Sequence, residues 1–200
     1  MTRRTPTTDV ALIAGFAALI AVCALLPEIK TGVGVPYSLQ TFGVLLTGAV
    51  LGPVRGFLSV TLYLVAGLVL PIYSGGTSGM AHYSGLTAGY LVAFPIAAAL
   101  CGFLVYRNRR NATQFAFVFT CGLLSSFLVV HTLGPLGLAW RGDMSLKAAF
   151  SADTAYFPGD IAKNVVMALV ASAVHRAFPD LISRRTTAEA PAEEPAPEPA

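Results

Sequence analysis

The sequence has 200 residues, of which 55% are hydrophobic and 12% are charged, and its mean hydropathy is +0.69. Soluble domains carry about 25% charged residues, so the composition excludes an ordinary soluble domain and predicts an integral membrane protein. At about 20 residues per span, the chain has room for about six helices in one bundle. The formal net charge of +3 is modest, and we expect no nucleic-acid partner.

Six apolar runs predict an all-α bundle of six transmembrane helices. These runs cover about residues 10–26, 38–51, 56–70, 86–105, 114–138 and 158–178. The first run follows a basic N-terminus, but further spans come after it, so we interpret it as a retained helix rather than a cleaved signal. The second and third runs are joined by a tight turn at 52–56 and are short for a core of about 30 Å.

The distribution of Lys and Arg predicts the orientation of the bundle. The basic residues on the side of the N-terminus would be Arg3, Arg4, Arg55, Arg107, Arg109, Arg110, Arg176, Arg184 and Arg185, and those on the other side Lys30, Arg141 and Lys147. Basic residues concentrate in cytoplasmic loops, so both termini are expected to be cytoplasmic. The expected organisation is a cytoplasmic N-terminus at 1–9, a membrane domain at 10–178, and a cytoplasmic tail at 179–200. From about residue 186 this tail holds only Thr, Ala, Glu and Pro, a composition that predicts disorder.

Several kinds of chemistry lack support in the sequence. Cys23, Cys101 and Cys121 each lie inside an apolar run, without disulfide or metal spacing, and are expected to pack as small hydrophobic side chains. The chain contains no Gly-x-x-x-x-Gly-Lys-Ser/Thr phosphate loop, so it is not expected to energise a process with ATP by itself. We therefore expect no metal and no bound cofactor.

Asp160 and Lys163 stand at the start of the last apolar run. Residues three apart share one helical face, and ionisable groups at membrane depth are costly and usually face a cavity or the bundle interior. The pair therefore predicts a site for a polar solute. The alternative is a salt bridge that only stabilises the first turn of this helix.

Three loops, at about 27–37, 71–85 and 139–157, are expected at the same outer end as this pair. They bring Gln40 and Thr41, the glycines Gly75 and Gly76, and Tyr90 toward one cavity. Gln40, Thr41 and Tyr90 could contact a ligand; alternatively, Ser38 or Thr41 could cap the second helix and Tyr90 could anchor at the interface. The two glycines could present backbone to a ligand or only form a turn. Tyr156 could line the mouth of the cavity, but a position in the interfacial aromatic belt is favoured.

An intramembrane serine protease is the main alternative from another class, because Gly76-Thr77-Ser78-Gly79 fits a Gly-x-Ser-Gly pattern. The serine and its base must lie within about 3 Å of each other. His175 is 15 residues beyond Asp160, which places it about 22 Å deeper, near the inner interface, whereas Ser78 belongs to an outer loop. This pairing is therefore not expected. His131 could lie nearer the outer side, but a four-residue motif in a glycine-rich stretch is weak support for a protease. A structural or channel-like membrane protein is the remaining alternative.

From about residue 10 to 178 the chain resembles the BioY family, the biotin-binding S components of energy-coupling-factor (ECF) transporters. The matching stretches are Val35-Pro36, Leu39-Gln40-Thr41-Phe42-Gly43-Val44-Leu45-Leu46, Gly48, Leu51-Gly52-Pro53, Leu62-Tyr63-Leu64, Gly67, Leu70-Pro71, Gly75-Gly76, Gly89-Tyr90, and Pro158-Gly159-Asp160 with Lys163. The resemblance implies a transport subunit of the bacterial cytoplasmic membrane that captures biotin from outside and delivers it inward. It also implies a transmembrane coupling protein and two ATP-binding subunits as partners.

The resemblance further implies roles for single residues. Asp160 would accept hydrogen bonds from the ureido N–H groups of biotin, and Lys163 would donate to its carbonyl or its carboxylate. The first helix would contact the coupling protein through alanines at small-xxx-small spacing, which permits close helix packing. These alanines are Ala14 with Ala18 and Ala17 with Ala21.

Overall fold

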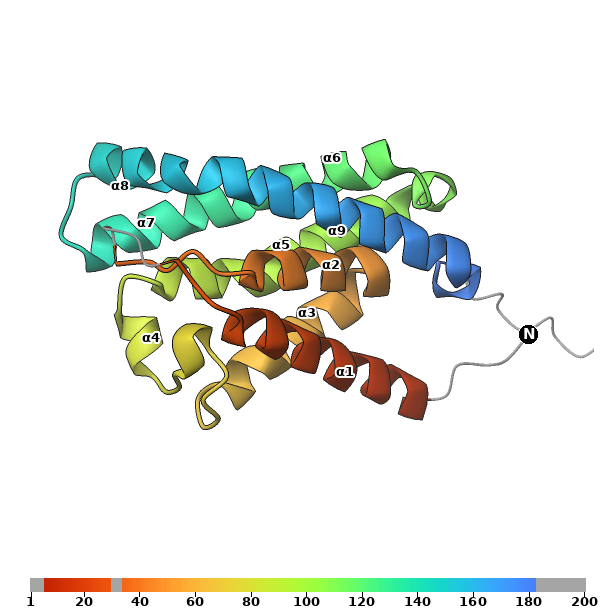
Figure 1. Ribbon diagram of the computed structural model, residues 1–200, viewed down its shortest axis with the longest axis horizontal. Coiled ribbons are helices and arrows are strands. Elements are labelled where there is room, and N and C mark those ends of the chain that lie inside the picture. Colours follow the sequence, from red (N-terminus) through yellow and green to blue (C-terminus); the bar gives the residue numbers. More distant parts are fainter. Residues whose placement is uncertain (1–5, 30–33, 183–200) are drawn as a thin grey trace, which may run out of the picture.

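The structure is a computed structural model in which residues 6–29 and 34–182 are described. Over these residues the secondary structure is helical, apart from isolated bridges (Figure 1). The α-helices are α1 (Pro6–Leu25), α2 (Gln40–Leu51), α3 (Pro53–Ala66), α4 (Ala81–Ser84), α5 (Ala88–Arg107), α6 (Phe115–Ser125), α7 (His131–Arg141), α8 (Leu146–Asp153) and α9 (Phe157–Ala177). The short segments are η1 (Ser74–Gly76), η2 (Arg109–Asn111), η3 (Ser126–Val130), η4 (Thr154–Tyr156) and η5 (Pro179–Leu181), of which η3 is a π-helix.

The chain is an all-helical membrane protein. Within the described ranges, four helical stretches are long and apolar enough to cross a membrane, namely Pro6–Leu25, Ala88–Arg107, Phe115–Arg141 and Leu146–Ala177. Large apolar side chains remain exposed on their outer faces, such as Val22 at 57%, Val92 at 54% and Leu169 at 53%. A soluble protein rarely exposes so much apolar surface. Lipid is therefore the natural environment of this surface.

The helices α2 and α3 are shorter, at 12 and 14 residues. At 1.5 Å per residue they are about 18 and 21 Å long, which agrees with the short second and third runs expected from the sequence. The turn between them is tighter than the predicted span of 52–56. Gly52 alone separates the two helices, with a φ of +84° that favours glycine, and Pro53 starts α3.

The six predicted apolar runs are helical to within a few residues at most of their ends, but two expected loops contain further helices. The 71–85 segment includes η1 and α4, and the 139–157 segment includes α8. The helix α8 is amphipathic rather than apolar. The Ser145 side chain caps it by accepting a hydrogen bond from the Ala148 backbone N–H at 3.2 Å. With only eight residues, α8 is too short to appear as an apolar run of its own.

Helix α2 lies inside the bundle, where it packs against α1, α3, α5, α6 and α9. Glycines allow the close approach. A Cβ atom at Gly48 would lie 2.1 Å from the carbonyl oxygen of Ala98 in α5, and one at Gly102 would lie 2.5 Å from the Gly52 backbone. Gly89 of α5 and Gly137 of α7 are in similar backbone contact. Small residues at helix crossings are typical of membrane bundles.

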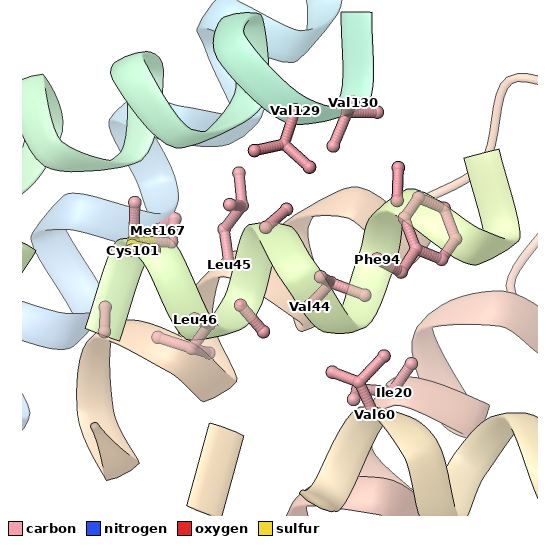
Figure 2. Close-up of a cluster of buried hydrophobic side chains, with 14 of the residues drawn as sticks. Ile20, Val44, Leu45, Leu46, Val60, Phe94, Cys101, Val129, Val130 and Met167 are labelled. Atoms are coloured by element: carbon pink, nitrogen blue, oxygen red, sulfur yellow. The ribbon is translucent and has the colours of Figure 1, made fainter. Parts of the chain in front are cut away.

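Side chains from several helices fill the space around α5 (Figure 2). Val44 and Leu45 from α2, Val60 from α3 and Met167 from α9 are almost completely buried there. The three cysteines are free and buried, which confirms that they pack as small hydrophobic side chains. The result is one continuous core that holds the ends of α5, α7 and α9 in place.

The first residue of α1 and the last residue of α9 lie at the same end of the bundle (Figure 1). Polar contacts join elements at this end. Arg55 forms an ion pair of 2.8 Å with Asp9, and the guanidinium of Arg109 donates to the Ile182 carbonyl at 2.9 Å. Residues 179–182 therefore pack on the bundle. The disorder expected from about residue 186 lies outside the described residues.

Substituting Gly48 by alanine is expected to destabilise the bundle. The new methyl group would overlap the Ala98 carbonyl, which is backbone and cannot rotate away, and overpacking costs about 1–3 kcal/mol or more. Thermal unfolding of the detergent-purified protein measures the effect. Gly15→Ala is the matched control, because a Cβ at Gly15 meets nothing within 4 Å. Equal unfolding temperatures for the two variants would contradict the close α2–α5 packing.

Candidate substrate-binding site

A cavity of about 380 Å³ lies at the end of the bundle opposite the start of α1 and the end of α9. Its volume is within the usual range for small-molecule sites, about 300–1,000 Å³. The cavity is lined by Glu28, Gly34, Val35, Pro36, Tyr37, Ser38, Gln40, Thr41, Tyr73, Ser74, Thr77, Ala81, His82, Gly85, Leu86, Thr87, Tyr90, Leu91, Phe94, Val130, His131, Tyr156, Asp160 and Lys163. Five of the seven residues predicted for a ligand site are in this lining: Gln40, Thr41, Tyr90, Asp160 and Lys163.

Asp160 and Lys163 form an ion pair in the cavity wall. The Lys163 ammonium donates to Asp160 Oδ1 at 2.7 Å, and the two side chains are only 10% and 6% exposed. Lys163 Nζ also lies 3.9 Å from the centre of the Tyr37 ring, in a cation–π contact. Because both charged groups line the cavity, the pair is available to a ligand as well as stabilising the first turns of α9.

His131 connects Asp160 to a second buried carboxylate. Its Nδ1 atom lies 2.8 Å from Asp153 Oδ2, and its Nε2 atom lies 3.3 Å from Asp160 Oδ2. The Tyr90 hydroxyl donates to the other oxygen of Asp153 at 2.7 Å. Elements α5, α7, α8 and α9 thus meet in one polar cluster, which consists of Tyr90, His131, Asp153, Asp160 and Lys163.

Local helix geometry brings these groups together. Asp153 ends α8, and Asp160 lies in the first turn of α9. His131 directly follows the π-helical segment η3, within one unbroken helical stretch from Phe115 to Arg141. Single π turns change the rotational phase of a helix and occur frequently at functional sites.

Aromatic side chains form the wall next to Lys163. The ring of Tyr37 stacks on that of Tyr156, with centres 5.9 Å apart and an angle of 9°. The Tyr156 hydroxyl donates to the Val35 carbonyl at 2.7 Å. Burial and, to a smaller extent, the negative charge of Asp160 raise the pKa of the Tyr37 hydroxyl. Tyr156 is buried and lines the cavity, so the alternative that it lines the site is confirmed and the favoured interfacial position was wrong.

A neutral polar group lies at the start of α2. The Gln40 side chain is buried, accepts a hydrogen bond from Ser38 Oγ at 3.1 Å, and donates to the Tyr63 hydroxyl at 2.5 Å. Ser38 Oγ also accepts from the Gln40 backbone N–H at 3.4 Å. Leu39 is the N-cap of α2, and no side chain caps this helix, so the Ser38 contact adds to the polar group at Gln40 without capping the helix.

The segment 71–85 contributes Ser74 and Thr77 to the lining, with Gly75 and Gly76 between them. Both glycines have positive φ angles, +73° and +70°, so they form the turn that presents their neighbours. The Ser74 hydroxyl donates to the carboxylate of Glu28, which also lines the cavity. Glu28 was not predicted from the sequence as a residue of this site.

His131 and Asp153 were also missed as members of the site. Asp153 was assigned to an outer loop, but its spacing of seven residues from Asp160 equals about two helical turns. This spacing was a usable signal that the two carboxylates share a side of the structure. Their common partner His131 is 22 residues from Asp153, and no local pattern predicts that contact.

The protease arrangement finds no support in the fold. Ser78 is exposed in the loop before α4, whereas His175 lies in the last turn of α9. Helix α4 and the last turn of α9 lie at opposite ends of the bundle (Figure 1). The His175 ring donates to the Ala49 carbonyl at 2.9 Å and is fully buried. His175 lies in the last turn of α9, as expected, but its side chain is inside the bundle rather than at the surface. This residue instead connects α9 to α2.

The predicted alanines of the first helix divide into two pairs. Ala17 and Ala21 are buried against this chain's own helices, at 7% and 8% exposure. Ala14 and Ala18 are exposed. Of the two pairs, only Ala14 and Ala18 are accessible for contact with another protein.

Comparisons with known proteins agree with this geometry. The BioY family matches residues 1–180. The chain is 35% identical to the biotin transporter BioY of Rhizobium etli, covering 89% of this chain and 98% of that protein. It is 38% identical to the biotin transporter BioY of Rhodobacter capsulatus, covering 88% and 98%. A crystal structure of the S-component for biotin from an ECF-type ABC transporter superposes with a TM-score of 0.82 at 26% identity, covering 88% of this chain and 95% of that one.

Gly159→Ala is expected to loosen the cavity wall. A Cβ atom at Gly159 would coincide with the position of the Tyr37 hydroxyl, so the tyrosine ring would have to leave its place beside Lys163. We expect a lower unfolding temperature than for Gly15→Ala and faster hydrogen exchange over residues 34–39. Unchanged exchange in this segment would show that Tyr37 does not depend on the space left by Gly159.

Proposed function

Since the chain belongs to the BioY family, we propose that it is the S-component of a biotin transporter and not an enzyme. The relatives named above are biotin transporters that match it over nearly their whole length. The S-component fold supports the same function. The observation that carries the proposal at residue level is the buried Asp160–Lys163 pair, which faces a cavity of about 380 Å³.

The chemistry of this cavity suits biotin. Biotin has a ureido ring with two N–H donors and one carbonyl acceptor, an apolar ring that contains sulfur, and a carboxylate on a flexible chain. Asp160 offers an acceptor and Lys163 a donor next to each other, which matches adjacent donor and acceptor groups of the ureido ring. Gln40, Thr41 and Tyr90 add polar groups, while Leu91 and Phe94 provide apolar surface.

The proposed topology places this cavity at the outer face of the bacterial cytoplasmic membrane. Six membrane segments, over about residues 10–178, would leave both termini in the cytoplasm, with residues 1–9 and 179–200 outside the membrane domain. The positive-inside pattern supports this orientation. The start of α1 and the end of α9 lie at the same end of the bundle, which agrees with both termini being cytoplasmic. The cavity lies at the opposite end and would therefore open away from the cytoplasm.

Transport would require an energising module. The sequence has no phosphate loop for ATP, so we propose a transmembrane coupling protein and two ATP-binding subunits as partners. The exposed pair Ala14 and Ala18 on α1 is the proposed contact with the coupling protein. Small residues at this spacing let a partner helix approach closely.

The biotin site is tested by calorimetric titration of biotin into the detergent-purified protein. Tight binding by the native chain is expected to weaken by roughly ten- to a hundredfold in Asp160→Asn and Lys163→Ala, because hydrogen bonds to charged groups contribute about 1.5–3 kcal/mol. Asp143→Asn and Lys147→Ala are matched controls, since both residues are exposed. Unchanged binding in the Asp160 and Lys163 variants would reduce the pair to a structural salt bridge, and no binding by the folded native chain would refute the substrate.

The same titration with biotin amide distinguishes the two roles considered for Lys163. If Lys163 meets the ureido carbonyl, Lys163→Ala weakens biotin and biotin amide by the same factor. If it pairs with the carboxylate, the variant loses affinity for biotin but not for the neutral amide. We expect the first result, because Lys163 is already paired with Asp160 at 2.7 Å, beside the proposed position of the ureido ring.

The coupling surface is tested by co-purification with an ECF module. Ala14→Leu and Ala18→Leu are expected to reduce the amount of co-purified module at least severalfold while biotin affinity stays unchanged, because the larger side chains prevent close helix packing. Ala116→Leu, at an exposed position of α6, is the matched control. Equal co-purification of all three variants would place the coupling contact elsewhere.

A further inference from the structure

His131 lies between two carboxylates deep in the polar cluster. One ring nitrogen is 2.8 Å from Asp153 and the other is 3.3 Å from Asp160, and the His131 and Asp153 side chains are 3% and 1% exposed. The rings of Phe127 and Phe157 pack on the imidazole, with centres 4.9 Å and 4.8 Å from it. The imidazole therefore packs against two aromatic rings and has one carboxylate near each nitrogen.

A neutral imidazole has one N–H group and one acceptor nitrogen, whereas an ionised carboxylate only accepts hydrogen bonds. A neutral His131 could therefore donate to Asp153 or to Asp160 but not to both, and its second nitrogen would face a carboxylate lone pair. Nδ1 hydrogen-bonds to Asp153, whereas Nε2 lies at ion-pair distance from Asp160 without forming a hydrogen bond. Only the imidazolium form turns an N–H group and positive charge toward both carboxylates. The observed distances thus favour a protonated ring.

The charge balance of the cluster leads to the same conclusion. The titratable groups that face His131 or its partners are Asp153 from α8, Asp160 and Lys163 from α9, Tyr90 from α5, and Tyr37 from the segment before α2, whose hydroxyl is neutral. With a protonated His131, the two carboxylates are balanced by two cations. With a neutral His131, one carboxylate remains unbalanced, and an uncompensated buried charge is costly.

We propose that His131 is a positioning residue that acts as an imidazolium, held by Asp153, and that keeps Asp160 ionised and oriented for the ligand. This inference rests on the proposed biotin function. Each oxygen of Asp160 would be held by one cation, Oδ1 by Lys163 and Oδ2 by His131, and would keep a second lone pair for a ureido N–H. Affinity for biotin would consequently depend on a proton that belongs to neither the ligand nor Asp160.

The protonation state can be measured without biotin. Nitrogen-15 NMR of histidine-labelled protein distinguishes an imidazolium from both neutral tautomers, and the chain has only three histidines to assign. We expect the His131 signals to show both nitrogens protonated at neutral pH, with and without biotin. Signals of a neutral tautomer would overturn the inference. This readout uses the native chain, so it does not depend on any variant folding.

Charge compensation tests whether this proton affects binding. His131→Gln leaves two carboxylates with one cation and is expected to weaken biotin binding at least about tenfold, the loss that follows from one charge-assisted hydrogen bond. Adding Asp153→Asn removes the excess negative charge, and we expect the double variant to regain most of the affinity. A purely structural role for His131 predicts no such rescue. A double variant no better than the single one would contradict the proposal.

The pH profile supplies a further readout. The affinity of the native chain for biotin is expected to fall as rising pH removes the proton from His131. The double variant lacks this histidine, so its affinity should not show that fall. His175→Gln is the control for loss of a buried histidine outside the cavity, and its profile should match that of the native chain. If native and double variant share one profile, the inference fails while the biotin function stands. If the folded native chain binds no biotin, the proposed function itself fails, whatever the NMR result.

Discussion

The Asp160 carboxylate imposes a constraint that much of the architecture satisfies. A carboxylate this deeply buried in a membrane bundle is costly unless cations and hydrogen-bond donors surround it. Lys163 supplies one partner from the next turn of the same helix, and His131 approaches from α7. His131 is in turn held by Asp153, which draws α8 into the same cluster. The relative positions of α7, α8 and α9 at this end of the bundle are therefore linked to a single charge.

A polar cluster of this kind needs rigid support, and close backbone packing provides it. Gly89 and Gly137 let α5 and α7 touch near Tyr90, which holds Asp153. Gly48 and Gly102 bring α2 and α5 together further along the bundle. Interhelical packing in a membrane is stabilised mainly by van der Waals contact and hydrogen bonds. Small shifts at these crossings would thus change the distances in the polar cluster.

The sequence was sufficient for the apolar helices and for the pairing of Asp160 with Lys163, because both depend on local periodicity and spacing. It was insufficient where a contact joins distant segments. Tyr37 occupies space that only a glycine at position 159 leaves free, and no pattern near either residue shows this. Asp153 was missed for another reason: α8 is amphipathic and carries Lys147, so its composition is typical of a loop or a surface helix.

Tyr37 connects segment 34–39, which lines the cavity, to the charged pair Asp160 and Lys163. Its backbone pairs with Ile29, while its ring stacks on Tyr156 and lies over the Lys163 ammonium. Tyr156 in turn holds the Val35 carbonyl. A ligand that draws Lys163 toward itself must weaken the cation–π contact, and one that displaces Tyr37 must expose the ion pair to water. Because Lys163 contacts Tyr37, binding of a ligand to Asp160 and Lys163 is energetically linked to the position of segment 34–39.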